Sequence, residues 1–396
     1  MKQNRFSVEC YSSIDDPQLT TAWAALEQTG TGTAFQSLDY VTAVHRSFLE
    51  QGTDVPRYVL IRDRSDGRAV LVMPMVEKHV LNVRILETLD YDVMDYALPL
   101  YCPDVFSRRA AARQATTAFL AFASEFDVLQ SKNWCNGING SDAMHSLLKW
   151  KAQGTETTYV VPLTADRFET YRKRNSAYKQ VMKKMRRLKK DFGAEVVHIT
   201  RHDEIDAAFD AMLEQRRERF RSIGKKDGIA DPRRQELFRA VAHKKCARGD
   251  ALFLGLRIQN RWIATSFAMN QNGVMNAQLA SFEEGPWTRH SPGIVTMALE
   301  MEWAHRRGLK KYVLGPGTSS YKERFGVDEL SRLTIKEPMS LTGKLYLVAL
   351  QTKTAAKNIV KQSLVDVPVA QGPRPDPRYP LLNKIQQLGY RKLAGL

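Results

Sequence analysis

The sequence predicts an α+β (mixed α/β) protein whose sheets are mixed and mostly antiparallel. Apolar runs of strand length alternate with segments whose apolar residues recur every three to four positions. Several neighbouring strand-like runs are joined by tight turns rather than by helices, as in residues 251–282. The chain has 396 residues, 43% of them hydrophobic, which is enough for two domains that each have a core.

Residues 1–164 form the first predicted domain. Asp15 or Asp16 ahead of Pro17 predicts the capped start of a helix over residues 15–30. Two apolar runs around Ser65-Asp66-Gly67 predict a hairpin over residues 56–80. The other elements expected in this half are helices at residues 37–52 and 108–126 and strands at residues 127–134 and 155–163.

Residues 165–340 form the second predicted domain. Its first element is one long helix over residues 171–193, with one apolar face made by Tyr178, Val181, Met185, Leu188 and Phe192. The elements expected after it are a strand at 194–200, helices at 203–224 and 231–249, antiparallel strands within 251–282, a helix at 291–308 and a strand at 309–317.

Residues 341–396 are expected to be a helical, proline-containing basic tail. Apolar residues of the segment 341–364 fall on one helical side, which predicts an amphipathic helix, and a proline-rich break follows. No apolar run approaches the roughly 18 residues that span a bilayer, and the N-terminus lacks an apolar signal segment. We therefore expect a cytoplasmic protein, with peripheral attachment to the inner face of the cell membrane as a further hypothesis.

Few features of the sequence indicate metal or redox chemistry. The four cysteines are scattered, which favours reduced thiols. His198 and His202 have the spacing of metal ligands on a helix, but their surroundings alternate like a strand, so no metal site is expected. No tightly bound cofactor is expected either.

The charge of the chain favours anionic partners. The formal net charge is +16, and between Arg167 and Asp191 eleven basic residues stand against two acidic ones. The helix over residues 171–190 could therefore bind phosphates, nucleic acid or anionic lipid, or it could simply be a solvated helix face. Nucleic acid is not expected unless a tRNA is the donor.

Two short glycine-containing motifs stand at strand and helix ends. In "RHSPGIVTM", Ser291 suits a helix cap, Pro292 its first turn, and Gly293 the close approach of a ligand, so an anion site or a plain capped helix would explain the motif. In "LGPGTSSYKERFG", Gly315 and Gly317 lie at the end of an apolar strand, but a full dinucleotide fingerprint is absent.

These motifs, taken in order, resemble a known family. "RERFRSIG", the hairpin "ALFLGLRIQNRWIATSFAMNQNG", "SFEEGPWTRHSPGIV" and "LGPGTSSYKERFG" are similar to the GNAT-type acyltransferase domain of the CelD/BcsL group, which is related to the FemABX aminoacyl transferases. In the first half "TAWAALEQTGTGTAFQSLDY" and "DYDVMDYALPL" resemble the same family more loosely. The resemblance implies two GNAT-like lobes, each a mixed, mostly antiparallel sheet flanked by helices.

The resemblance also implies roles for particular residues. Lys322 would polarise the carbonyl under attack, Tyr321 would form a wall of the acyl or acceptor pocket, and Glu283 would be the base or would orient a water. The cofactor-binding residues implied are Ser291, Pro292, Gly293, Gly315 and Gly317, and the substrate-binding residues are Arg219, Phe220, Phe325, Asp95 and Tyr96.

The expected function is an N-acyltransferase that moves an acyl group from a thioester to an amine without a covalent enzyme intermediate. The usual acetyl-CoA signature before the helix is replaced by "RHSPGI", so acyl-CoA and acyl carrier protein both remain as donors. The acceptor would be an amine on a sugar or exopolysaccharide precursor, or a lipid amine such as a sphingoid base. The alternatives are a FemABX-like transferase that uses aminoacyl-tRNA and a non-catalytic module of a membrane polysaccharide-synthesis complex.

Overall fold

A single mixed sheet runs through most of the described structure. The computed structural model describes residues 4–135, 137–138 and 152–352, and these contain a 13-stranded sheet in the order β1-β2-β3-β4-β6-β13-β7-β12-β11-β10-β9-β8, with β5 beside β3. Most neighbours are antiparallel, whereas β4–β6 and β11–β12 are parallel. The mixed, mostly antiparallel class predicted from the sequence is confirmed.

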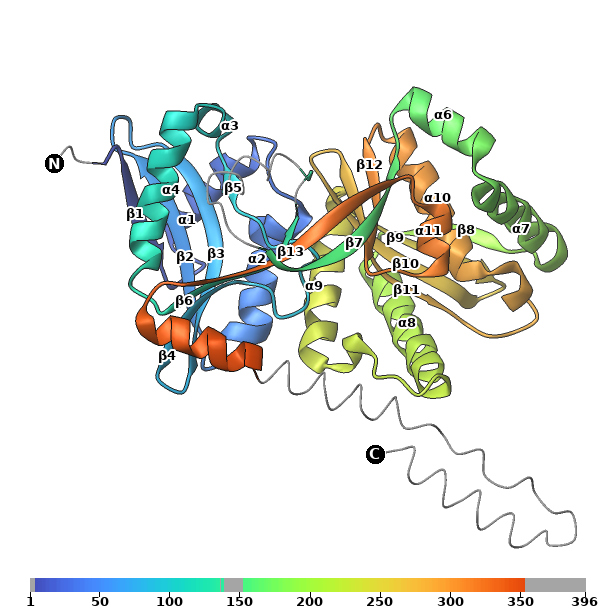
Figure 1. Ribbon diagram of the computed structural model, residues 1–396. Helices are drawn as coiled ribbons and strands as arrows, with labels where there is room; N and C mark the ends of the chain where they lie inside the picture. Colours follow the sequence, from blue (N-terminus) through green and yellow to red (C-terminus); the bar gives the residue numbers. More distant parts are fainter. Residues whose placement is uncertain (1–3, 136, 139–151, 353–396) are drawn as a thin grey trace, which may run out of the picture. The chain divides into compact units, whose positions relative to one another are not determined.

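The first lobe contains the first six strands, with helices packed on the sheet (Figure 1). Asp16 caps its first helix by accepting from the backbone N–H groups of Gln18 and Leu19. Its elements are β1 (Phe6–Tyr11), α1 (Pro17–Glu27), η1 (Ala34–Gln36), α2 (Leu38–Val44), a π-helical turn η2 (His45–Leu49), β2 (Val55–Asp63), β3 (Ala69–Val80), β4 (Val83–Thr88), β5 (Leu100–Tyr101), α3 (Pro103–Phe106), α4 (Arg109–Ala123) and β6 (Val128–Cys135).

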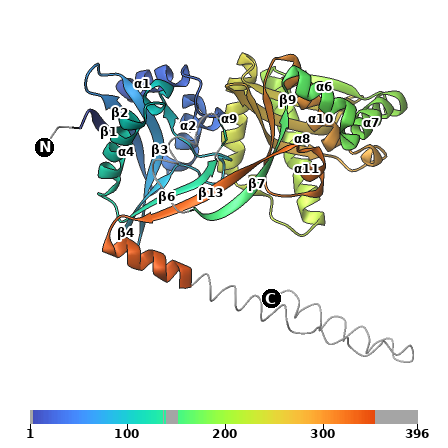
Figure 2. The same cartoon turned by 45° about the horizontal axis from the view of Figure 1, so that its top comes forward.

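The second lobe begins with the long strand β7 and contains most of the elements that form the site (Figure 2). Its elements are β7 (Ala152–Pro162), α6 (Ala165–Arg174), α7 (Ser176–Phe192), β8 (Glu195–Ile199), α8 (His202–Ser222), η3 (Gly228–Ala230), α9 (Pro232–Arg248), β9 (Ala251–Ile258), β10 (Arg261–Gln271), β11 (Val274–Phe282), η4 (Thr288–His290), α10 (Pro292–Arg306), β12 (Lys311–Pro316), α11 (Ser320–Phe325) and β13 (Asp328–Pro338).

Two long strands join the lobes. β13 pairs with β7 along most of its length, from Asp328 opposite Val160 to Ile335 opposite Ala152, and it also pairs with β6. β7 in turn pairs with β12 of the second lobe. Figure 1 shows the two strands running side by side between the lobes. The sheets of the two lobes are therefore one hydrogen-bonded sheet. The strand that joins them, β13, was not predicted from the sequence.

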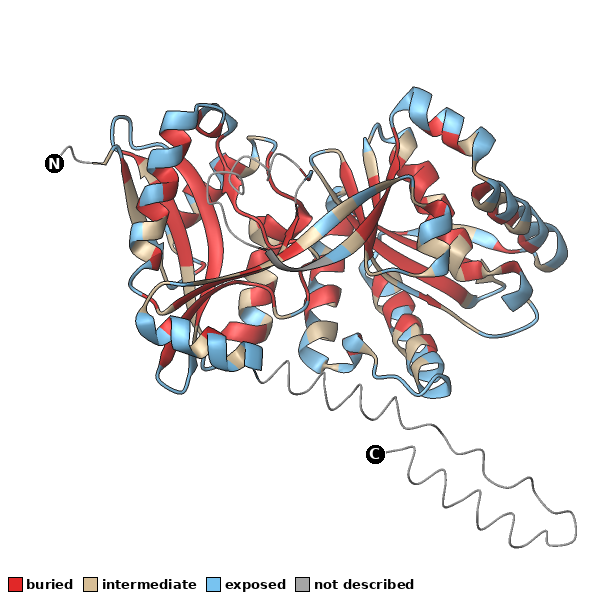
Figure 3. Ribbon diagram, viewed as in Figure 1, coloured by how far each residue is buried: buried red, intermediate tan, exposed pale blue. Residues whose placement is uncertain are grey.

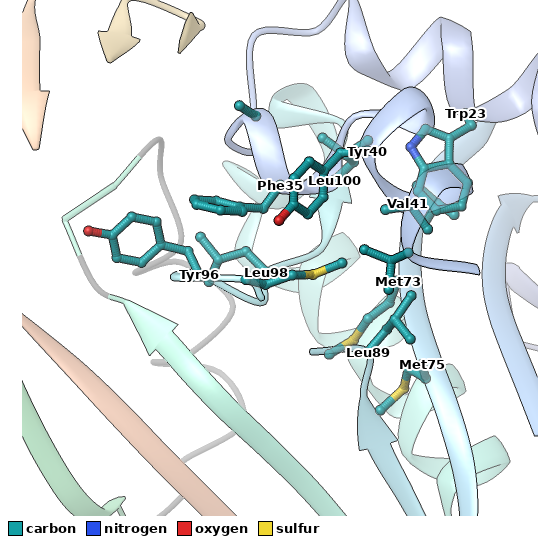
Figure 4. Close-up of a cluster of buried hydrophobic side chains, with 14 of the residues drawn as sticks. Trp23, Phe35, Tyr40, Val41, Met73, Met75, Leu89, Tyr96, Leu98 and Leu100 are labelled. Carbon is teal, nitrogen blue, oxygen red and sulfur yellow. The ribbon is translucent and has the colours of Figure 1, made fainter. Parts of the chain in front are cut away.

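Strands and helices of both lobes carry buried residues (Figure 3), which belong to two apolar clusters. In the first lobe, Trp23, Phe35 and Tyr40 lie among methionines and leucines of the sheet (Figure 4). Trp23 is fully buried, and its indole N–H donates to the Gln36 carbonyl at 2.9 Å. In the second lobe, a separate apolar cluster packs α7 and α10 against the sheet. These cores fix the strand ends that carry the site.

The predicted long helix at 171–193 is wrong in one respect, because the structure has two helices there. Asn175 ends α6 with extended φ and ψ angles of −71° and 111°, and its side chain caps α7 by accepting from the Tyr178 N–H at 2.9 Å. Its amide also donates to the Arg324 carbonyl at 2.9 Å, which ties the break to α11. The apolar face predicted for this segment is buried from Tyr178 to Leu188 as expected.

Other boundaries of the structure bear on the predicted domains. The chain divides into two units, residues 1–344 and 345–396, and the predicted boundary at 164 lies within the first unit, just before α6. Residues 341–352 of the predicted tail are helical, whereas 353–396 lie outside the described residues. No helix in the described part of the chain has the length and apolar character needed to cross a membrane.

Asn175→Ala should destabilise the protein by about 1 kcal/mol, because the α7 cap is lost. Asn175→Asp should lose less, since its carboxylate keeps the cap acceptor and suits a helix N-terminus. Urea unfolding of both variants and the wild type would measure the difference. Equal midpoints for the alanine variant and the wild type would show that this cap does not hold the break between α6 and α7.

Candidate active site

A pocket of about 700 Å³ lies where strands β11 and β12 separate. The two strands pair in parallel over three residues only, from Val274 opposite Lys311 to Asn276 opposite Val313. Beyond that point β11 continues to Phe282 and β12 to Pro316 without pairing with each other. The pocket is therefore an opening in the sheet that is closed at the paired end.

Irregular backbone in both strands explains the opening. Gln278 is the extra residue of a β-bulge in β11, because Ala277 pairs with Ala268 while Leu279 pairs with Phe267. In β12, Gly315 has a φ of +75°, a conformation that favours glycine, and the next residue is a proline that has no N–H for a ladder. The glycine–proline motif thus ends the pairing at the site.

Helices α8 and α10 cover the opening from opposite faces of the sheet. Ser281 of β11 donates to Gln215 of α8 at 2.6 Å and is bonded to Thr265 of β10. The next residue of β10, Ser266, lies beside Glu300 of α10. Because successive strand residues point to opposite faces, the pocket passes through the sheet from the α8 side to the α10 side.

Lys322 and Asp95 meet next to Gly315 in the pocket. A Cβ on Gly315 would lie 3.8 Å from the Lys322 ammonium and 3.9 Å from the Asp95 carboxylate. The Lys322 Nζ donates to the Gly315 carbonyl at 3.2 Å and to the Pro316 carbonyl at 2.6 Å. An ammonium has three N–H donors, so one donor remains for a ligand. Burial lowers the pKa of Lys322, and the Asp95 charge opposes this.

Asp95 belongs to the first lobe but lies in the pocket of the second. It stands in the segment between β4 and β5, and its carboxylate accepts from the Gln278 amide at 3.0 Å. Arg332 of β13 donates to the Asp95 carbonyl at 3.0 Å and pairs with Glu156 of β7. Burial raises the pKa of the Asp95 carboxyl to about 6, despite the nearby cations Arg332 and Lys322. Asp95 can therefore exchange a proton near neutral pH.

Glu300 and Tyr312 form a second polar group at the inner, α10 side of the pocket. Glu300 is 2% exposed, and one of its carboxylate oxygens accepts a hydrogen bond from the Tyr312 hydroxyl. Among the described residues, its other oxygen, Oε1, and the hydroxyl of Ser266 form no well-directed hydrogen bond, although Ser266 lies close enough to lower the pKa of Glu300. Burial raises the pKa of Glu300 to about 7. All three residues line the pocket.

The N-terminus of α10 lies at the open end of the pocket. Gly293 in its first turn lies against the Phe282 ring, 3.3 Å from where a Cβ would be. Ser291 occupies the N-cap position but does not cap the helix as predicted: it has a φ of +51°, and its hydroxyl accepts instead from Lys184 of α7 at 2.9 Å. A helix N-terminus presents unbonded N–H groups and a positive dipole end to an anion.

Further cations surround this helix N-terminus. Burial lowers the pKa of His290, and the charges of Arg289, Arg187 and Lys184 lower it as well. On the α8 side, Arg219 lies 4.8 Å over the Phe282 ring and has no carboxylate partner among the described residues. By contrast, Arg216 is bound to Asp227 at 2.6 Å, so its role is structural. The open end of the pocket is therefore positively charged.

The structure brings most of the predicted site residues together in this pocket. Those that line it are Lys322, Tyr321, Ser291, Pro292, Gly293, Gly315, Arg219, Phe220 and Asp95. The remaining four are not among the lining residues. Gly317 has a φ of +84° and bonds to Thr157, Phe325 and Tyr96 are buried in apolar surroundings, and Glu283 is held by Arg261.

Glu283 was the predicted base, and its surroundings differ from those of Asp95. The Nε of Arg261 donates to its carboxylate at 2.7 Å, and its carbonyl accepts from the Trp287 indole at 3.0 Å. Its position at the end of β11 is thus occupied by structural contacts outside the pocket.

Sequence reasoning missed Gln278, Ser266, Glu300 and Tyr312. Glu300 leaves a trace in the sequence, because it is a charged residue within the apolar segment "VTMALEMEWA". No such signal marks Gln278, since a bulge is not visible in the apolar pattern. In the described part of the chain no cluster of His, Cys, Asp and Glu could hold a metal ion.

Comparisons with known proteins agree with this geometry. A family model described as the acetyltransferase (GNAT) domain matches residues 175–323, which include every pocket-lining residue except Asp95. No curated protein matches the chain.

Several solved structures share the fold over most of the chain. FemX is 12% identical with a TM-score of 0.56, over 83% of this chain and 97% of its own. L-PGS from Bacillus licheniformis is 12% identical with a TM-score of 0.50, over 88% and 98%. A conserved protein of unknown function from Bacteroides thetaiotaomicron VPI-5482 is also 12% identical, with a TM-score of 0.50 over 82% and 99%. Residues 175–323 therefore match a GNAT acetyltransferase domain, and most of the chain shares the two-lobed fold of FemX.

Proposed function

We propose that the chain is an N-acyltransferase whose donor is an acyl thioester held in the opening between β11 and β12. The observation that carries this proposal is the pocket through the sheet, which joins a cationic open end to Lys322 and Asp95. Such a pocket admits an extended donor from one face and an acceptor from the other. The acceptor amine would reach the donor from the α8 side, where Arg219 and Phe220 line the pocket.

The donor that fits best is acyl-CoA. Its pantetheine arm contains amides, and an extended amide chain can pair with the edge of β11 that β12 leaves free. Its phosphates would lie at the N-terminus of α10, where Lys184 and Arg289 add positive charge. An acyl carrier protein presents the same arm and remains a second donor of this kind.

The transfer needs no covalent enzyme intermediate. The acceptor nitrogen attacks the thioester carbon, a C–N bond forms, the C–S bond breaks and the thiolate leaves. The nitrogen loses one proton, which Asp95 accepts and passes to the leaving thiolate, so that amide and free thiol are the products. A carboxyl with a pKa of about 6 is suited to this exchange near neutral pH.

Lys322 would stabilise the negative charge that develops on the carbonyl oxygen. Its position is fixed by the Gly315 and Pro316 carbonyls, which leaves one N–H for the oxygen. A preorganised donor of this kind contributes roughly 3–4 kcal/mol to the transition state. Because burial lowers the pKa of Lys322, the Asp95 charge beside it helps to keep it protonated.

A second candidate is a FemABX-like transferase that takes an aminoacyl group from a tRNA. The observation in its favour is the exposed basic surface of α7, together with the fold shared with FemX and L-PGS. The acceptors proposed for either enzyme are an amino sugar of an exopolysaccharide precursor or a lipid amine at an anionic membrane surface.

Thermal unfolding with coenzyme A, acetyl-CoA, palmitoyl-CoA and an aminoacylated tRNA pool separates these candidates. A ligand at 100 times its dissociation constant stabilises the protein by roughly 2.7 kcal/mol. We expect the three CoA compounds to raise the unfolding temperature and the tRNA to leave it unchanged. Stabilisation by tRNA alone would reject the thioester donor.

Lys322→Met should lower kcat by about 10²–10³-fold, since it removes the donor to the carbonyl oxygen and keeps the length of the side chain. The matched control is Lys226→Met, an exposed lysine outside the pocket, which should leave kcat unchanged. Steady-state kinetics of both variants gives the comparison. A kcat within twofold of the wild type for Lys322→Met would remove this residue from the mechanism.

The rate should depend on pH through Asp95. Only the carboxylate form accepts a proton, so below about pH 6 kcat/KM of the wild type should fall by a further factor of ten per pH unit. Asp95→Asn should be slower and should lack this added slope, while any slope from the acceptor amine stays. An unchanged profile in Asp95→Asn would show that another group accepts the proton.

The exposed basic residues of α7 should contribute a salt-dependent part of donor or membrane binding. Replacing Lys183, Arg186, Lys189 and Lys190 by glutamine should weaken binding to anionic liposomes or tRNA and flatten its salt dependence. Co-sedimentation and filter binding at several salt concentrations would measure this. Unchanged binding to both would mean that the basic surface is only a solvated helix face.

A further inference from the structure

The inner end of the pocket is polar, although the walls around it are apolar. Met297, Leu314 and Ala277 line the pocket beside Ser266, Glu300 and Tyr312. Ser266 and Glu300 are each 2% exposed, and the Glu300 Oε1 and Ser266 Oγ atoms lie near each other without a well-directed hydrogen bond among the described residues. Buried polar atoms without partners cost free energy, and nearly all such atoms in proteins are satisfied.

A second buried glutamate on α10, Glu302, has a different environment from Glu300. It is also buried on α10, two residues later, but its carboxylate pairs with Arg172 at 3.2 Å and accepts from the Tyr178 hydroxyl. The Oε1 atom of Glu302 is thus held by two partners inside the core, and Glu302 does not line the pocket. Glu300, by contrast, lines the pocket and has one oxygen left for a ligand.

The position of Glu300 assigns this oxygen to the acyl group of the donor. The N-terminus of α10 marks the open end of the pocket, and Glu300 lies seven residues after Gly293, which is about 10 Å further along the helix. Tyr312, its partner, stands in the paired section of β12 opposite Met275. Lys322 and Glu300 line the same pocket, so a donor whose carbonyl meets Lys322 can place its acyl group against Glu300.

We propose that the enzyme selects a short acyl group that ends in a hydrogen-bond donor, a hydroxyl or an ammonium, which binds Glu300 and Ser266. This inference rests on the proposed thioester donor and names its acyl class. Apolar walls contact the carbon chain, and the polar end satisfies the two unpartnered oxygens. An alkyl group of the same size would leave both oxygens buried and unpaired. Enzymes reject substrates strongly when binding leaves buried polar groups of the site without partners.

The raised pKa of Glu300 fits either polar end. With a pKa of about 7, the side chain exists in both protonation states near neutral pH. The carboxylate would bind an ammonium, and either form bonds a hydroxyl, which is both donor and acceptor.

Binding of four CoA compounds to the full chain tests the proposal. Isothermal titration would compare coenzyme A, which carries no acyl group, with butyryl-CoA, 3-hydroxybutyryl-CoA and β-alanyl-CoA, whose acyl groups are similar in size. We expect the wild type to bind the hydroxyl or the ammonium compound at least about tenfold more tightly than butyryl-CoA. The compound preferred distinguishes the two polar ends.

Three variants connect that preference to Glu300. Glu300→Leu combined with Tyr312→Phe removes both partners of the buried pair, which is better tolerated than removing one, and it should reverse the preference in favour of butyryl-CoA. Glu300→Gln keeps the bond to Tyr312 and should weaken β-alanyl-CoA more than 3-hydroxybutyryl-CoA. Glu302→Gln is the matched control and should lower stability without changing the ratio of the four dissociation constants.

The failures are distinguishable. If coenzyme A and butyryl-CoA bind the wild type as tightly as the polar compounds, the acyl preference is wrong and the thioester donor stands. If the preference persists in the Glu300→Leu, Tyr312→Phe variant, another residue sets it and the assignment to Glu300 is wrong. If none of the four compounds binds, both the thioester donor and the inference from it are rejected.

Discussion

The separation of two parallel strands is the constraint on which the site depends. β11 and β12 remain paired for three residues, and then a bulge at Gln278 and a left-handed Gly315 prevent further pairing. A sheet that opened without cover would expose unpaired backbone groups and apolar side chains to water. Here α8 and α10 close the opening from both faces, so the defect becomes a pocket whose walls carry Lys322 and Glu300.

The first lobe completes this site, which gives the two-lobed architecture a chemical meaning. Asp95 comes from the segment between β4 and β5, yet its carboxylate bonds to Gln278 of β11 and lies near Lys322. Arg332 on β13 fixes the Asp95 backbone, and β13 is also the strand that joins the two sheets. Movement of one lobe against the other would therefore change the distance between Asp95 and Lys322, the two groups proposed to act in the transfer.

The sequence predicts elements well where one periodic pattern decides, and less well where tertiary contacts decide. The helices that became α1, α4, α8, α9 and α10 and the hairpins β2–β3 and β9–β10–β11 follow from apolar spacing and turn residues. β13 was missed because its sequence "DELSRLTIKEP" is short of apolar residues and is stabilised by pairing with β7 and β6. The break at Asn175 was missed because both sides of it have helical composition, while the decisive contact is with Arg324, far away in sequence.

Some residues of the candidate site could also be predicted from the sequence and others could not, for a physical reason. Gly315 could be predicted from the glycine turn at the end of an apolar strand, whereas Lys322 and Asp95 were assigned through the family resemblance. Glu300 could not be predicted as a site residue, because a glutamate in an apolar helix can equally be a structural partner in the core. Glu302, which pairs with Arg172, is such a structural partner. The difference between them is a single unsatisfied oxygen in a pocket. A buried carboxylate costs free energy, and a ligand that completed its hydrogen bonds would recover part of that cost, which is why we propose an acyl group with a polar end.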